Sequence, residues 1–299
     1  MAKKQIKILV VDDQQYNLDI IEEYLSEAKF DIELEDNSVQ AWAKLEAQPE
    51  LYDIVLLDWM MPNLDGMEIL KRIKAHPQLK HIPVIMQTAR TDDDDIRQGI
   101  AAGAYYYLTK PFDEDKLLSI VNTAVDDFVQ HHDLEQQLRA QTQEEIVTDS
   151  ANFKIRDLNE AATLASCLAK SCPDPDKVVS GISELLINAI EHGNLNIGYS
   201  EKSQLKHDGM WEKEIIHRLS LPEYKDKTVH VDFKKEDKMI SITIRDEGNG
   251  FDWRDYLEFH PERMFDCNGR GIAMAKALSF DSIQYSDKGN VVTAMIYLQ

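Results

Sequence analysis

Charged side chains that could take part in one reaction lie at the ends of apolar runs within the first 110 residues of the sequence. Asp12 and Asp13 follow one such run, Asp58 ends another, and Lys110 follows a third. Crowded carboxylates repel one another, so an oxygen-preferring divalent cation such as Mg²⁺ is needed to keep them ionised. A carboxylate beside Mg²⁺ and a lysine can attack a phosphoryl group, because both cations offset the charge that develops during transfer. With Thr88 at the end of a further run, these residues predict a phosphoryl-transfer site.

A second set of polar residues repeats along one face of an expected helix. In "SELLINAIEHGN", residues 183–194, Glu184, Asn188 and His192 recur every four residues, whereas apolar residues occupy another face. An otherwise ordinary core helix therefore carries a polar ladder.

Two glycine-rich segments further along give the ladder a chemical context. "RDEGNGF" at 245–251 comes just after an expected strand, and "NGRGIAMAKAL" at 268–278 opens an expected helix. Glycine lets the backbone approach a ligand closely, and amides at the start of a helix favour phosphate. Each segment alone fits an ordinary turn, since neither is a Walker loop or a dinucleotide fingerprint. Joined to Asn188 upstream, they indicate a phosphate-binding site.

The elements that must position the first set alternate regularly along the chain. Short apolar strands are separated by amphipathic helices, which implies a doubly wound parallel sheet with its ligand-binding groups at the carboxyl ends of the strands. Acidic residues that merely cap turns would explain each position separately, but not their convergence at one edge of a sheet. The expected strands are 6–11, 32–35, 53–58, 83–88 and 105–109.

From about residue 151 the order of elements changes. A short strand precedes a helix capped by Asp157, and a long helix, 176–192, then carries the ladder and ends at Gly193, which suits a left-handed cap. Alternating strands follow, and they predict a mixed sheet with one buried face. This is an α/β sandwich rather than a second doubly wound domain. Its later strands are "VHVDF", "MISITI", "SIQY" and "VVTAMIY".

Length and charge limit the classes of function. A chain of 299 residues suggests two domains, at about 150 residues per domain. The net charge of -21 repels nucleic acid and anionic membranes, so neither is an expected partner. No apolar stretch of about 18 residues is present, and the first residues lack a signal-peptide cleavage site, which together predict a cytoplasmic protein. Three cysteines without ligand-like spacing are expected to be packing thiols.

Between the two regions, residues 126–150 predict a helical linker. Its seam positions include His132, Glu135 and Arg139, so a homodimer through a coiled coil here would have only a short interface. "HHDLE" suggests a phosphorylated histidine at His132, but a sensor kinase needs a second long helix, which does not fit between residues 135 and 150. A solvated linker histidine is the favoured interpretation.

Residues 1 to about 125 resemble the receiver domain of bacterial two-component response regulators. "VVDDQ", "LLDWMMPNLDG", "QTA" and "YLTKPF" match that pattern in order and spacing. The resemblance implies a flavodoxin-like fold with Asp58 as the phospho-acceptor, Thr88 and Lys110 at the phosphoryl group and Tyr107 as an aromatic switch. It also implies a sensor histidine kinase or phosphotransfer protein as the partner. The implied magnesium ligands are Asp12, Asp13, Asp58 and the backbone carbonyl of Met60.

Residues from about 150 to 299 resemble the GHKL, or Bergerat, ATP-binding fold shared by histidine kinases, gyrase and anti-sigma-factor serine kinases. "ELLINAIEHGN", "DEGNGF" and "NGRGIAM" are similar to its N, G1 and G2 boxes. The resemblance implies that Asn188 ligates Mg²⁺ on the phosphates, that Asp246 accepts the adenine amino proton, and that His192 and Arg270 lie near the phosphates. A short lid favours the anti-sigma type. The glycines of that lid would be Gly248, Gly250, Gly269 and Gly271.

Glu184 and the segment 195–228 leave two questions open. Glu184 lies one turn before Asn188 and is favoured as the base that takes a proton from an attacking hydroxyl; the alternative is that it orients a water or the asparagine. In 195–228, Trp211, Ile215 and Leu219 share a helical face, which fits a local packing arm as well as an interface.

The two resemblances together predict a phosphorelay response regulator with three parts: 1–125, 126–150 and 151–299. Phosphorylation of Asp58 would control an ATP-dependent serine/threonine kinase that acts on an anti-sigma antagonist or a sigma factor. One alternative is an ATP-dependent partner-binding switch without catalysis. Another is a histidine-kinase relative that passes phosphate from His132 to Asp58.

Overall fold

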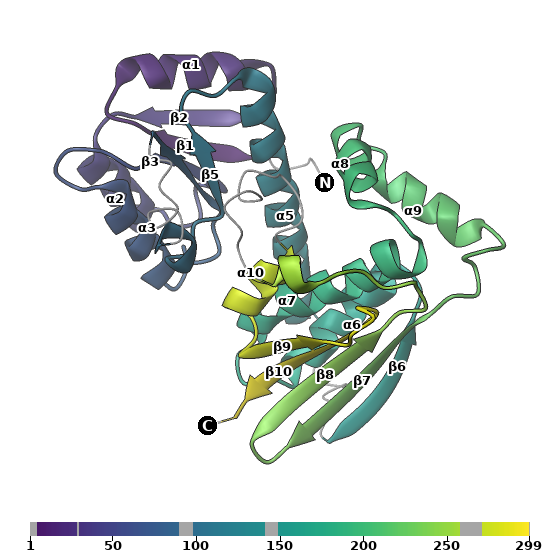
Figure 1. Ribbon diagram of the computed structural model, residues 1–299. Coiled ribbons are helices and arrows are strands. Elements are labelled where there is room, and N and C mark those ends of the chain that lie inside the picture. The colour runs from purple at the N-terminus through teal and green to yellow at the C-terminus, as the bar shows by residue number, and fades with distance from the viewer. Residues whose placement is uncertain (1–4, 29, 90–97, 141–148, 258–270, 299) are drawn as a thin grey trace. The chain divides into compact units, whose positions relative to one another are not determined.

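The computed structural model describes residues 5–28, 30–89, 98–140, 149–257 and 271–298 (Figure 1). The described chain divides into two compact units, one within residues 5–130 and the other within 131–298. None of the helices in these ranges is long and apolar enough to cross a membrane.

The first unit is built on a five-stranded parallel sheet in the order β2-β1-β3-β4-β5. This sheet confirms the predicted flavodoxin-like fold. Strands β1 and β3 are apolar and buried along their length, as expected for parallel strands covered on both faces. Each strand lies within one residue of its predicted range: β1 Lys7–Val11, β2 Asp31–Glu35, β3 Ile54–Asp58, β4 Val84–Thr88 and β5 Tyr106–Thr109.

Helices cover both faces of this sheet. Alternate strand residues face opposite sides, so Leu9 and Leu57 pack with α2 and α3, whereas Ile8 and Leu56 pack with α1 and α5. Asp65 caps α3 by accepting a hydrogen bond from the Glu68 amide at 2.7 Å. The described helices are α1 Gln15–Leu25, the 3₁₀ turn Ser26–Ala28, α2 Ser38–Ala47, α3 Gly66–Ala75 and α5 Glu114–Ala140.

Helix α5 belongs to both units. Its residues up to Gln130 lie in the first unit and those from His131 in the second, where Leu134 is buried in the core. His132 is exposed on this helix, with its Nε2 2.8 Å from Nε2 of Gln136. The predicted linker therefore begins inside a helix of the receiver-like unit.

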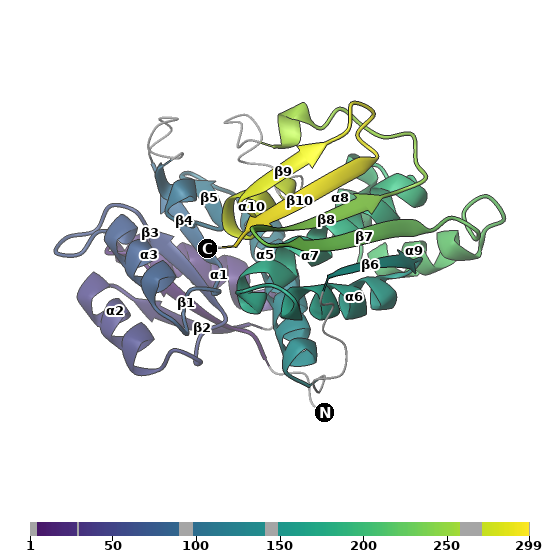
Figure 2. The same ribbon diagram turned by 90° about the horizontal axis from the view of Figure 1, so that it is seen from below.

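The second unit is a two-layer α/β sandwich. Its sheet has the order β6-β7-β8-β10-β9. One face packs against α6 (Leu158–Lys170), α7 (Pro175–Asn188) and α10 (Gly271–Leu278), as Figures 1 and 2 show. Buried and half-buried residues alternate along β7, β8 and β10, which is the pattern of a sheet with one covered face. The strands are β6 Ser150–Ile155, β7 Val229–Glu236, β8 Met239–Arg245, β9 Ser282–Tyr285 and β10 Val291–Tyr297.

Two predictions for the second unit were wrong. Its sheet is antiparallel at every pair and not mixed, because each strand returns beside its neighbour in the opposite direction. The ladder helix also does not end at a left-handed Gly193: α7 continues into a π-helical turn, Ala189–Asn194, and the positive φ occurs at Asn196. The wider turn changes the direction in which its side chains point.

The remaining helices of the second unit surround the end of α7. Asp157 caps α6 as predicted, accepting a hydrogen bond from the Glu160 amide at 2.9 Å. In the segment 195–228, Ile215 is buried, and Trp211 and Leu219 pack against the core of this unit. The helices are α6 Leu158–Lys170, α7 Pro175–Asn188, α8 Tyr199–His207, α9 Trp211–Ser220, the 3₁₀ turn Arg254–Tyr256 and α10 Gly271–Leu278.

Candidate functional site

An acidic site lies at the carboxyl ends of the first unit's strands. Asp58 ends β3, Asp12 follows β1 and Lys110 follows β5, so the parallel sheet brings the three side chains together. The Lys110 ammonium lies 2.5 Å from Oδ2 of Asp12 and 2.5 Å from Oδ1 of Asp58. Both carboxylates are buried, so one lysine bridges two negative groups that water does not screen.

The surroundings of Asp58 oppose its ionisation. Burial raises the pKa of its carboxyl, the Lys110 ammonium counteracts this rise, and the charge of Asp12 adds to it. Oδ2 of Asp58 accepts a hydrogen bond from the Met60 amide at 2.8 Å, and Asp12 is held by the Asn17 amide at 3.0 and 3.1 Å. A further positive charge at this site would therefore be favourable.

The other predicted residues of the acidic site have different surroundings. Asp13 is exposed, and within the described residues no three Asp, Glu, His or Cys side chains are close enough to form a metal site by themselves. Thr88 is buried at the end of β4, where its carbonyl accepts a hydrogen bond from the Lys110 amide at 2.8 Å. Tyr107 is buried with its ring centroid 6.0 Å from that of Trp59.

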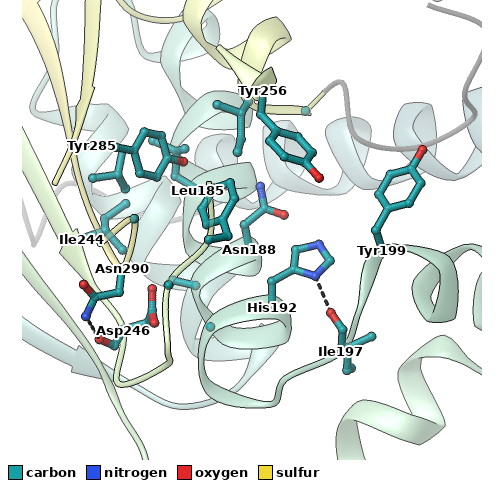
Figure 3. A pocket seen from close by; sticks show the side chains of 18 of the residues that line it. Leu185, Asn188, His192, Ile197, Tyr199, Ile244, Asp246, Tyr256, Tyr285 and Asn290 are labelled. Atoms are coloured by element: carbon teal, nitrogen blue, oxygen red, sulfur yellow. Dashed lines mark hydrogen bonds between the residues drawn. The ribbon is translucent and has the colours of Figure 1, made fainter. Parts of the chain in front are cut away.

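A cavity of about 270 Å³ lies in the second unit, between the end of α7 and the sheet (Figure 3). Glu184, Asn188 and His192 form one wall, so the ladder faces a cavity, while Asp246 lies at its far side. Gly250 and Gly271 also line it. Gly248 lies in a smaller neighbouring cavity, and Gly269 and Arg270 lie outside the described residues.

Contacts within the wall hold the ladder in place. Nδ2 of Asn188 donates a hydrogen bond to Oε1 of Glu184 at 2.9 Å. A Cβ atom on Gly271 would lie 1.7 Å from the same Oε1, so a larger residue at the start of α10 would force the Glu184 side chain to move. Nδ1 of His192 lies 2.5 Å from the carbonyl of Ile197, its hydrogen-bond acceptor.

The far side of the cavity combines one carboxylate with apolar side chains. Asp246 accepts a hydrogen bond from the Gly248 amide at 2.8 Å, and burial raises the pKa of its carboxyl. Ile244 and Tyr285 line the cavity beside it, with Tyr285 stacked on Trp253 at 5.8 Å between ring centroids. This end suits a flat apolar group that carries a hydrogen-bond donor.

Comparisons with known proteins identify the domain family of the first unit. The model of the response regulator receiver domain family matches residues 8–122, which contain the acidic site. Residues 8–122 form a response regulator receiver domain. The matched residues end before the cavity of the second unit.

Similarity to curated proteins is partial. Response regulator PleD of Caulobacter vibrioides is 37% identical over 117 residues, which are 39% of this chain and 25% of PleD. The 3',5'-cyclic-nucleotide phosphodiesterase regA of Dictyostelium discoideum is 27% identical over 222 residues, 73% of this chain and 27% of that protein. The chain thus spans about a quarter of the length of these two relatives.

Similarity to solved structures is also partial. A putative response regulator from Chloroflexus aurantiacus J-10-fl has 29% identity and a TM-score of 0.39, covering 41% of this chain and 99% of that one. The receiver domain of the sensor histidine kinase PA1611 from Pseudomonas aeruginosa PAO1, a structure with magnesium coordinated in its active site cleft, has 30% identity and a TM-score of 0.37. It covers 41% of this chain and 98% of that chain.

Sequence reasoning missed residues at both sites. In the receiver domain, a Cβ on Gly66 would lie 2.1 Å from the Asp58 carbonyl oxygen, so this glycine allows α3 to begin against the end of β3. The "LDG" triplet was a signal for it. In the second unit, Tyr199 and Lys202 of α8 line the cavity, and the buried Glu191 lies behind it. No local pattern marks these three.

Proposed function

We propose that phosphorylation of Asp58 in the receiver domain controls an ATP-binding, kinase-like output formed by the second unit. The observation that carries the proposal is the cavity wall in which Asn188 donates to Glu184, across from Asp246. A carboxylate at an apolar end and an amide at a polar end are separate features that one purine nucleotide would satisfy together.

The receiver residues fit Mg²⁺ by their donor chemistry. Asp12, Asp13, Asp58 and the Met60 carbonyl would supply the hard oxygen ligands that this ion prefers. The ion would offset charge on the phosphoryl group during transfer. Asp58 would attack the phosphoryl group carried on a histidine of a sensor histidine kinase or phosphotransfer protein, so that the P–N bond breaks and the imidazole leaves. Lys110, whose ammonium lies 2.5 Å from Oδ1 of Asp58, would stabilise the product anion.

The second unit's residues fit ATP with Mg²⁺. Asp246 would accept a hydrogen bond from the adenine amino group beside Ile244 and Tyr285, and the Asn188 side-chain oxygen would bind the ion at the phosphates. Gly250 and Gly271 line the cavity, and each lets its backbone lie close to a neighbouring residue, because an added Cβ would collide with the Lys288 carbonyl oxygen or with Glu184. The substrate would be a serine or threonine hydroxyl of a partner protein, for which an anti-sigma antagonist or a sigma factor is the predicted class.

One observation favours a second candidate, a nucleotide-dependent binding switch without phosphoryl transfer. Glu184 accepts the hydrogen bond of Asn188, so the structure supports a role in orienting the asparagine as well as the role of general base. Transfer of phosphate to a partner hydroxyl separates the two candidates, because a binding switch would bind ATP without transferring its phosphate.

Labelling the purified chain with phosphate tests both halves. The chain is incubated with labelled acetyl phosphate, or with labelled ATP and candidate partners, each with Mg²⁺. Asp58→Asn should abolish acetyl-phosphate labelling, whereas Asp19→Asn, at an exposed position of α1, should leave it intact. Asn188→Ala should weaken ATP binding at least about tenfold. Phosphate incorporation from acetyl phosphate into Asp58→Asn would refute the proposed phosphorylation site. Unchanged ATP affinity in Asn188→Ala would refute the nucleotide site.

A further inference from the structure

The segment 195–228 forms part of the cavity wall. Its helix α8 contributes Tyr199 and Lys202 to the lining, next to Asn188 and His192. Figure 3 shows Tyr199 beyond His192, on the side away from Asp246. The segment therefore borders the end of the cavity at which the nucleotide phosphates are proposed to lie.

A buried carboxylate ties this segment to the π-helical turn. Glu191 is fully buried, and its Oε1 contacts the Lys202 ammonium and lies 3.0 Å from Nε2 of His192. Its Oε2 accepts a hydrogen bond from Nε1 of Trp211 at 2.9 Å. One carboxylate thus joins α8, α9 and the ladder residue His192.

These contacts make Glu191 a permanent negative charge. Burial alone would raise the pKa of its carboxyl, but the Lys202 charge and the contacts with His192 outweigh burial and lower the pKa to about 2. A buried charge of this kind is tolerated only while its partners remain in place. Glu191 therefore fixes the position of the Lys202 ammonium at the cavity.

Further hydrogen bonds make the segment rigid. Nη1 of Arg218 donates to the carbonyls of Leu195 and Asn196, each at 2.9 Å. Nζ of Lys227 donates to the carbonyl of Asn194 at 3.0 Å. The backbone that leads from the π-helical turn into α8 is thus held by two cations from later in the same segment.

Within the described lining of the cavity, Lys202 is the sole lysine or arginine. A polyphosphate in this cavity needs a cation to offset its charge, and its carboxylate neighbours Glu184 and Glu191 would otherwise repel it. An ammonium offers three N–H donors, so Lys202 can bind a phosphate oxygen while it keeps its contact with Glu191.

We propose that Lys202 binds the phosphates of the nucleotide and that Glu191 is the positioning residue that holds it there. The inference rests on the proposed nucleotide site and deepens it: the segment 195–228 supplies a cation that, together with the ion held by Asn188, distinguishes a nucleoside triphosphate from a nucleoside. The competing role for Lys202 is that of a counter-ion for Glu191, with no contact to ligand.

The test measures affinity for ATP with Mg²⁺ and for adenosine, by calorimetry on the full chain. Lys202→Met removes the cation but leaves the buried Glu191 charge without its lysine partner, so the double variant Glu191→Gln with Lys202→Met removes both charges together. Lys213→Met, at an exposed position of α9, is the matched control. Thermal unfolding of each variant identifies those that do not fold.

The expected result is a selective loss of affinity for ATP. The double variant should bind ATP about 10- to 100-fold more weakly and adenosine as the parent does, whereas Lys213→Met should bind both normally. Unchanged ATP affinity in the double variant, or an equal loss for ATP and adenosine, would overturn the inference and leave the nucleotide site standing. A parent chain that binds neither ligand would overturn the proposed nucleotide site itself.

Discussion

Replacing Glu191 by glutamine should release the segment 195–228 from the end of α7. The substitution keeps the size of the side chain but removes its charge, so the Lys202 ammonium, whose side chain is 12% exposed, loses its buried partner. The hydrogen bond from Trp211 to the side chain can persist. The change therefore isolates the electrostatic part of the anchor.

The magnitude follows from the pKa of Glu191. Contacts in the folded state lower it from 4.5 to about 2, and a shift of this size corresponds to about 3 kcal/mol of stability. Because the folded-state pKa is the lower one, this stability is present above about pH 4.5 and is lost as the pH falls toward 2. Breaking a buried ion pair by removing one partner costs about 3–5 kcal/mol in other proteins, which is consistent.

Hydrogen exchange measured by mass spectrometry on the full chain can detect this loss locally. At pH 7, amides of α8 in Glu191→Gln should exchange about 100-fold faster, whereas β1 and β3 in the receiver domain should be unchanged. Glu201→Gln is the matched control, because it breaks an ion pair with Arg218 in the same segment. The Glu201 side chain in that pair is 42% exposed. Exposed pairs contribute at most about 1 kcal/mol, so its effect should be several-fold at most.

Equal exchange rates of α8 in Glu191→Gln and Glu201→Gln would refute the reasoning. The added substitution Lys202→Met should restore part of the protection lost in Glu191→Gln, since no buried charge is then left unpaired. Exchange in the double variant faster than in Glu191→Gln would show that the two side chains do not act as a pair.

Two further predictions concern a glycine and a lysine. Gly248→Ala should destabilise the second unit by about 1–3 kcal/mol, because the new Cβ would lie 2.3 Å from the Gly193 carbonyl oxygen, whereas Gly198→Ala has open space and should be nearly neutral in chemical denaturation. Burial lowers the pKa of Lys74 to about 8 from 10.5, so the unfolded chain binds more protons between these values. The stability of the receiver unit should therefore rise between about pH 8 and 10.5 in the parent, relative to Lys74→Met, and equal profiles would contradict this.

The receiver domain was predictable from local pattern because its chemistry follows from its strands. Continuous apolar runs identify buried parallel strands, and residues just after them must meet at one edge of the sheet. Asp12, Asp58 and Lys110 were found in this way, and the Lys110 contacts at 2.5 Å show that the edge does bring them together. Gly66 was missed although the "LDG" triplet marks it, because its role is to let one backbone segment approach another and not to contribute a side chain.

In the second unit, the sequence by itself determined the strands, the ladder and the two glycine-rich segments, since each depends on a short local pattern. The direction of the strands and the way the ladder helix ends depended on tertiary structure. A π-helical turn replaces the expected cap, and a Cβ on Gly193 would lie 2.4 Å from Cγ of Asp246. Glu191 shows most clearly what a local sequence pattern cannot predict. It reads as an ordinary polar helix residue, yet its partners Lys202 and Trp211 lie 11 and 20 residues away, on separate helices. Periodicity predicts the face on which a charge lies, but only the packing of distant elements decides whether it is buried and which groups balance it.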